Sequence, residues 1–227
     1  MKRQRSEAAA EMAATSEIRS AIEELSLMAV NCGGDVQKQT SGRVPLKPFL
    51  SICNLLIQVL DKIGPTMAVL RQDMHQNIER LERFHDSDPS AYCDVVEILK
   101  KEVSEGRAKK GPTCSKSFVW LTRSLDFSLS LVQLLLVDLG RNMDEAVEES
   151  YTATLKPWHG WISSAAYKVA LKLLPDSQTL VNILKVKDQD HEKLKEEMQS
   201  LIALLTPVLE QNKEILKIYG LDKLKST

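Results

Sequence analysis

The sequence is poor in the residues that interrupt or cross-link a chain. Its 227 residues include only 9 glycines and 8 prolines, so long helices are compatible with it. The four cysteines, Cys32, Cys53, Cys93 and Cys114, are widely spread and form no CxxC pair. We interpret them as free thiols in a reducing compartment, and therefore expect a cytoplasmic protein.

Net charge and long apolar runs are also lacking. The 30 basic and 31 acidic side chains give a formal net charge of -1, which argues against a dedicated nucleic-acid-binding domain. The first residues are basic, but no apolar run follows them, so they do not form a secretory signal. The longest apolar stretch, Phe127 to Val137, is too short to span a bilayer. These absences predict a soluble protein.

The common catalytic motifs are missing. Neither GxSxG nor HExxH occurs, and no glycine-rich phosphate loop is present. The four histidines and the many carboxylates show no spacing that favours an acid–base pair. We therefore expect a protein that is not an enzyme and that uses no metal and no cofactor.

What the sequence does contain is helical periodicity, with 43% hydrophobic residues and no lasting alternation of period two. We expect a frayed tail at 1–15, a loop at 31–43 and a single all-α domain at 16–227. About eight helices should pack in two layers. Their expected positions are 18–25, 49–60, 65–84, a helix through Val95 capped by Asp86–Pro89, 112–140, 144–155, 158–174, 178–185 and 190–219.

One row of polar side chains lies along the helix that follows Gly64. Asp73, Asn77 and Arg80 each precede a member of the apolar stripe by one residue, so they line the border of the buried face. The ordinary interpretation is a solvated edge. The alternative is a polar recognition strip beside an apolar pocket.

Two further segments are unusual. In "KPWHGWISS" (156–164), His159 opens an expected helix beside its apolar seam, where a lone histidine is more often structural. Trp161 lies on the polar side with Lys168 and Lys172, which is typical of a membrane-interface tryptophan; the alternative is a tryptophan covered by a neighbouring loop. Trp120 lies in an almost wholly apolar helix, where it serves either in core packing or as a platform for a sugar ring.

Three ordered motifs resemble the glycolipid transfer protein family. They are Asp73-x3-Asn77-x2-Arg80, then "FVWLTRSLDF" (118–127), then "KPWHGWI" (156–162), and the resemblance covers roughly residues 46–220. It implies a two-layer sandwich of eight helices that carries a glycosphingolipid. The sugar would lie at the surface and the ceramide chains in an apolar tunnel between the layers.

The resemblance also implies roles for individual residues. Asp73 and Asn77 would bind sugar hydroxyls, with Asp73 also reaching the ceramide amide, and Arg80 would add a sugar contact. Trp120 would stack under the sugar, and His159 would donate to the ceramide carbonyl. Tunnel-lining positions match Phe127 and Tyr167, and a membrane-docking position matches Trp161.

Some positions depart from the family pattern. Arg80 stands where the family usually has lysine, and Tyr219 lies about a turn too early to match a C-terminal tyrosine of the animal members. A sister group that carries ceramide-1-phosphate has cations at the positions of Asn77, Trp120 and Ser124. Because a phosphate requires cations, these neutral residues favour a neutral sugar headgroup.

We therefore expect a monomeric, non-enzymatic carrier of glucosylceramide or galactosylceramide that contacts membranes transiently and binds no nucleic acid. One alternative is a ceramide-1-phosphate carrier. Another is a glycolipid sensor or adaptor that signals to a protein partner.

Overall fold

A computed structural model of the chain describes residues 16–31 and 42–226. The tail expected at 1–15 and most of the loop expected at 31–43 lie outside this part of the chain. The described residues form nine α-helices, one at each of the positions expected from the sequence, together with one short 3-10 helix. They are α2 (Glu17–Asn31), α3 (Leu46–Ile63), η1 (Pro65–Met67), α4 (Ala68–Ser87), α5 (Val95–Ser104), α6 (Cys114–Val137), α7 (Met143–Thr154), α8 (Trp161–Leu171), α9 (Ser177–Leu184) and α10 (His191–Ile218).

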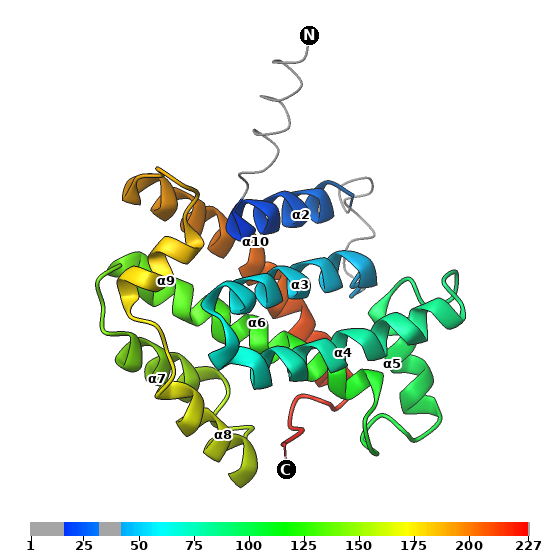
Figure 1. The fold of residues 1–227 in the computed structure, drawn as a ribbon. Coiled ribbons are helices and arrows are strands. Elements are labelled where there is room, and N and C mark those ends of the chain that lie inside the picture. The colour runs from blue at the N-terminus through cyan, green and yellow to red at the C-terminus, as the bar shows by residue number, and fades with distance from the viewer. Residues whose placement is uncertain (1–15, 32–41, 227) are drawn as a thin grey trace.

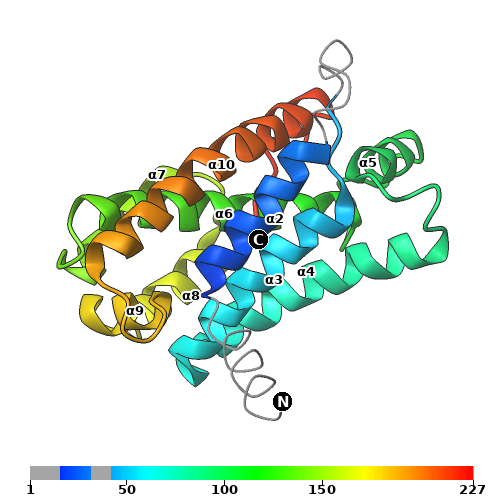
Figure 2. The same ribbon diagram turned by 90° about the horizontal axis from the view of Figure 1, so that it is seen from above.

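The helices are arranged in two layers, as the sequence predicts. Helices α2, α3 and α4 lie side by side in one layer, and α6, α7 and α10 form the other (Figures 1 and 2). Helix α6 contacts α4 across the layers and has α7 and α10 as neighbours. The all-α class is confirmed, since the described residues contain only one isolated β-bridge, between Pro45 and Asp94.

Aromatic and aliphatic side chains close the space between the layers. Phe49 of α3 meets Phe118 of α6 edge to face, with ring centroids 5.1 Å apart, and both residues are fully buried. This geometry is favourable for aromatic pairs beyond the area that they bury. The apolar pattern of α6 is thus explained by its central position.

Helix α6 as a whole is long and apolar enough to cross a membrane, by length and composition alone. Its 24 residues exceed the shorter stretch, Phe127 to Val137, that the sequence singles out. In the fold, α6 instead packs against α4, α5, α7 and α10. Core helices of this kind share the composition of membrane spans.

A buried carboxylate fixes the beginning of α6. Glu102, 2% exposed, accepts hydrogen bonds from the backbone N–H groups of Cys114 and Ser115 at 3.0 and 2.7 Å. Thr113 is the N-cap and accepts from the N–H of Lys116 at 3.2 Å. Together they satisfy three of the N–H groups that a helix start leaves unpaired, and the negative charge suits the helix dipole.

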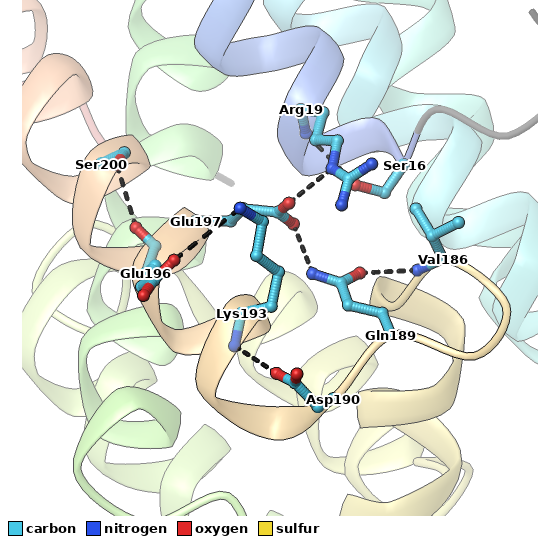
Figure 3. A network of polar contacts seen from close by, with 9 residues as sticks. All are labelled: Ser16, Arg19, Val186, Gln189, Asp190, Lys193, Glu196, Glu197 and Ser200. Carbon is cyan, nitrogen blue, oxygen red and sulfur yellow. Dashed lines mark hydrogen bonds and ion pairs between the residues drawn. The ribbon is translucent and has the colours of Figure 1, made fainter.

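A second polar network joins α2 to α10 (Figure 3). Glu197, 7% exposed, pairs with Arg19 of α2 and accepts from Gln189 at 2.8 Å. Gln189 in turn accepts from the backbone N–H of Val186 at 2.9 Å. This network ties the first described helix to the last helix and to the loop before it.

Candidate headgroup site

The polar row on α4 is a chain of hydrogen bonds. Asn77 Nδ2 donates to the backbone carbonyl of Asp73 at 2.8 Å and to its Oδ2 at 3.3 Å. Arg80 Nη1 donates to Asn77 Oδ1 at 3.3 Å and to Ser117 Oγ of α6 at 2.7 Å. The row is therefore connected internally and anchored to the central helix, which a merely solvated edge does not require.

Burial changes along this row. Asn77 is only 7% exposed and Ser117 is fully buried, whereas Asp73 is exposed at the outer end. Atoms packed around the carboxyl group nevertheless raise the pKa of Asp73 by desolvation, and the positive charge of Arg80 opposes this shift. Within the described residues, Asp73 Oδ1 and Arg80 Nη2 make no hydrogen bond. These two atoms remain available to a ligand.

Trp120 lies one helical turn beyond Ser117 on α6, so it is next to the anchored end of the polar row. Its ring centroid is 5.8 Å from that of His159, and it is partly exposed. Trp120 and His159, which lie far apart in the sequence, are thus brought together in the fold.

The sequence predicts that His159 opens a helix, but this residue lies in the connection between α7 and α8. Helix α8 begins two residues later, at Trp161, because the turn after α7 continues with a hydrogen bond from the N–H of His159 to the carbonyl of Leu155 at 3.1 Å. Nδ1 of His159 is buried and has no partner. Burial, and then the charge of Arg123, lower the pKa of His159, so the ring is neutral near pH 7.

Phe127 and Tyr167 are both partly buried and pack against the core. Tyr167 stacks on Tyr151 of α7, with centroids 3.5 Å apart and ring planes 5° apart. Its hydroxyl is buried without a partner, and burial, with nearby Glu148, raises the pKa of Tyr167 to about 12. This hydroxyl is an uncompensated polar atom in an otherwise apolar contact.

The apolar tunnel stays a prediction. One concavity of about 490 Å³ lies along α7, between Arg141 and Ala153. Another of about 450 Å³ lies between α2 and α10, beside Arg19 and Glu197. Neither is lined by a residue that the sequence predicts in the site.

Helix α8 differs from the sequence-based expectation. Trp161 is 79% exposed, as predicted for a docking residue, but Ile162 and Val169, which belong to the apolar seam expected beside His159, are also 50% and 62% exposed. No residue of α8 is classed as buried. The helix therefore presents apolar side chains on both of its sides.

Three residues of this region are not predicted by sequence reasoning. Ser117 anchors Arg80, Tyr151 lies between His159 and Tyr167, and Arg123 packs against Trp120 with its guanidinium carbon 4.8 Å from the ring centroid. For Ser117 and Arg123 the available signal is their spacing from Trp120 on α6: the three residues recur every three positions and therefore share one side of the helix. Tyr151 lies on α7, and spacing gives no such signal for it.

Comparisons with known proteins agree with the fold. A family model for glycolipid transfer protein matches residues 44–186. Glycolipid transfer protein 3 of Arabidopsis thaliana is 52% identical to this chain, and the similarity spans 92% of each of the two chains. Glycolipid transfer protein 2 of the same plant is 48% identical, and the similarity spans 100% of both chains.

Solved structures show the same fold. A structure of FAPP2, described as selecting simple glycosphingolipids with this fold, superposes with a TM-score of 0.72 at 24% identity, covering 82% of this chain and 90% of that one. Mouse ceramide-1-phosphate transfer protein in its apo form superposes with a TM-score of 0.78 at 18% identity. The superposition covers 92% of this chain and 100% of the mouse chain.

The two-layer helical sandwich of this chain is thus the fold of these solved lipid-binding proteins. The chain belongs to the glycolipid transfer protein family, whose members are non-enzymatic lipid transfer proteins.

Proposed function

We propose that this protein carries glycosphingolipids of the glucosylceramide and galactosylceramide type between membranes. The observation that carries the proposal is the hydrogen-bonded row of Asp73, Asn77 and Arg80, anchored to Ser117 next to Trp120. Sugar hydroxyls require acceptors and donors together, and the row offers both at its outer surface.

The remaining atoms suit a ceramide below the sugar. The partly exposed ring of Trp120 provides an apolar surface for the C–H face of a hexose. His159 is neutral and partly buried and holds an unpartnered Nδ1, so it needs a polar partner that an amide group can supply. Asp73, on the other side, accepts from the amide N–H.

In the proposed complex, the hydrocarbon chains lie between the two helical layers, along Phe127 and Tyr167. Trp161, with the exposed apolar residues of α8, contacts the cytosolic face of the membrane during loading and release. One domain spanning 16–227, acting as a monomer, suffices for this cycle.

The charges around the headgroup position favour a sugar over a phosphate. Arg80 already hydrogen-bonds Asn77 and Ser117. The second cation nearby, Arg123, directs Nη1 and Nη2 to the backbone carbonyls of Leu224 and Asp222. A phosphate monoester is bound by several free cationic donors, and of the terminal nitrogens of these two arginines only Nη2 of Arg80 is left without a hydrogen bond among the described residues.

The proposal is tested by transfer between vesicles. Donor vesicles containing galactosylceramide, glucosylceramide or ceramide-1-phosphate are mixed with acceptor vesicles and purified protein, without ATP or metal. We expect transfer of both glycosylceramides and little transfer of ceramide-1-phosphate. Equal transfer of the phosphate contradicts the headgroup assignment. Binding without transfer supports a sensor instead, and a change in the mass of the lipid supports an enzyme.

A further inference from the structure

Arg123 is an arginine in the interior of the molecule. It lies on the central helix α6 and is 6% exposed. Its guanidinium carbon is 4.8 Å from the ring centroid of Trp120 and 4.4 Å from that of Trp158. Cation–π contacts at this distance are favourable, and more so when the cation is shielded from water.

The same guanidinium holds the end of the described chain. Nη1 donates to the carbonyl of Leu224 and Nη2 to that of Asp222, both at 2.7 Å. The two donors of one planar group thus bind two carbonyls of one segment, a geometry that lysine cannot reproduce. Burial lowers the pKa of Arg123 to about 10, so the side chain still carries its charge at neutral pH.

The C-terminal segment also binds both neighbours of His159. Ser226 donates its N–H to the carbonyl of Trp158, and its Oγ accepts from the N–H of Gly160, both at 2.9 Å. His159 is therefore held from either side by a segment that Arg123 fixes to α6. These contacts restrain the position of His159, in addition to the hydrogen bond from its own N–H to the carbonyl of Leu155.

We propose that Arg123, the backbone carbonyls of Asp222 and Leu224, and Ser226 form a strap that positions His159 opposite Trp120, so that the two halves of the headgroup site stay aligned. The proposal rests on the proposed glycosphingolipid function. In it Arg123 is a positioning residue: it touches Trp120 and Trp158 and directs its terminal nitrogens away from the ligand, to backbone carbonyls.

The first test compares Arg123→Gln and Arg123→Lys with Lys116→Gln, a matched removal of a cation on the same helix. Binding of galactosylceramide to the purified proteins is measured after circular dichroism has verified that each variant is folded. Because two charge-assisted hydrogen bonds are lost, we expect at least roughly tenfold weaker binding for Arg123→Gln. Arg123→Lys, which keeps the charge but not the fork, should recover part of this loss, and Lys116→Gln should bind like the unmodified protein.

The second test uses a neutral change at the other end of the strap. Ser226→Ala removes the acceptor for the N–H of Gly160, and Lys225→Gln, at an exposed neighbouring position, is its control. The pKa of His159 is followed by NMR in both variants. Burial and the charge of Arg123 lower this pKa, and the other titratable ring against His159 is Tyr151.

If the strap fixes His159, Ser226→Ala admits water to the ring, so the pKa of His159 rises and galactosylceramide binding weakens by a few-fold. Lys225→Gln changes neither. An unchanged pKa and unchanged binding in Ser226→Ala overturn the strap, even if Arg123→Gln does not fold. Should the unmodified protein bind no glycosylceramide, the failure lies with the proposed function, and the NMR comparison still decides whether the strap exists.

Discussion

The two sides of the candidate site are built differently. On the α4 and α6 side, Asn77 and Ser117 are buried, and Arg80 links them by hydrogen bonds. On the other side, no residue of α8 itself is buried, and Trp161 and Val169 are largely exposed. Segments with few buried contacts open at low free-energy cost. From this contrast we propose that the α4 and α6 side recognises the headgroup, while the loosely packed helix α8 gives the hydrocarbon chains access to the interior.

The largest effect that we predict is a change of ligand class when two residues of the α4 and α6 side are substituted together. Asn77→Lys together with Trp120→Arg adds two cations to Arg80, enough for a phosphate monoester that carries about -1.5 to -2 charge. We expect loss of galactosylceramide transfer and a gain of ceramide-1-phosphate binding. Asn77 is buried and Arg123 already lies against Trp120, so a circular-dichroism melt must first show a folded variant.

A folded double variant that still carries galactosylceramide and ignores the phosphate would show that selectivity lies elsewhere. The single variants give the change in binding free energy that each position contributes. The difference between the change in the double variant and the sum of the two single changes measures the coupling between the positions.

Asp73→Val should impair the same side without changing the ligand class. Removing a charge-assisted acceptor costs on the order of 1.5–3 kcal/mol, which is about a tenfold to hundredfold loss of affinity. The exposed Asp73 contributes little to packing, so the melting temperature should hardly change. The control is Glu82→Val on the same helix. Transfer at the rate of the unmodified protein would mean that the polar row is only a surface feature.

On the loosely packed side, Trp161→Ala should weaken membrane partition rather than ligand binding. A tryptophan side chain buries a large apolar area at a membrane interface, so we expect a roughly tenfold lower vesicle affinity. Val137→Ala is a suitable control, because Val137 is 84% exposed at the end of another helix. Equal vesicle affinities of the Trp161→Ala and Val137→Ala variants would show that Trp161 does not contribute to membrane docking.

The smallest effect is expected for Tyr167→Phe. Its buried hydroxyl has no partner, so its removal should raise the free energy of unfolding by about 1 kcal/mol and leave transfer intact. Tyr151→Phe is the matched control, because the Tyr151 hydroxyl donates to Ser164 at 3.4 Å and its loss should not stabilise. A clear loss of stability in Tyr167→Phe would show that this hydroxyl is satisfied.

Periodicity predicts the helices well and their ends less well. The all-α class, the two layers and the central position of α6 follow from the apolar pattern. The predicted cap within Asp86–Pro89 is wrong, since α4 continues to Ser87 and Asp94 caps α5, accepting from the N–H of Val96 at 2.9 Å. Several residues near that boundary are competent caps, and tertiary contacts select among them.

The polar row and the exposure of Trp161 were accessible from spacing, because residues on one helix face are fixed by the geometry of that helix. The contacts of Arg123 with Leu224 and Asp222 were not, since they join segments about a hundred residues apart. The exposed seam of α8 was missed for a related reason. An apolar stripe shows that a surface avoids water, but not whether the covering partner is protein or lipid.

The most direct test of the glycosphingolipid assignment is a competition read by native mass spectrometry. Delipidated protein is mixed with galactosylceramide and ceramide-1-phosphate of the same acyl chain at equal concentrations, and the mass of the bound lipid is recorded. We predict one galactosylceramide per protein chain, with the phosphate displaced. A complex that holds mainly ceramide-1-phosphate would contradict the sugar-binding role of Asp73, Asn77 and Trp120.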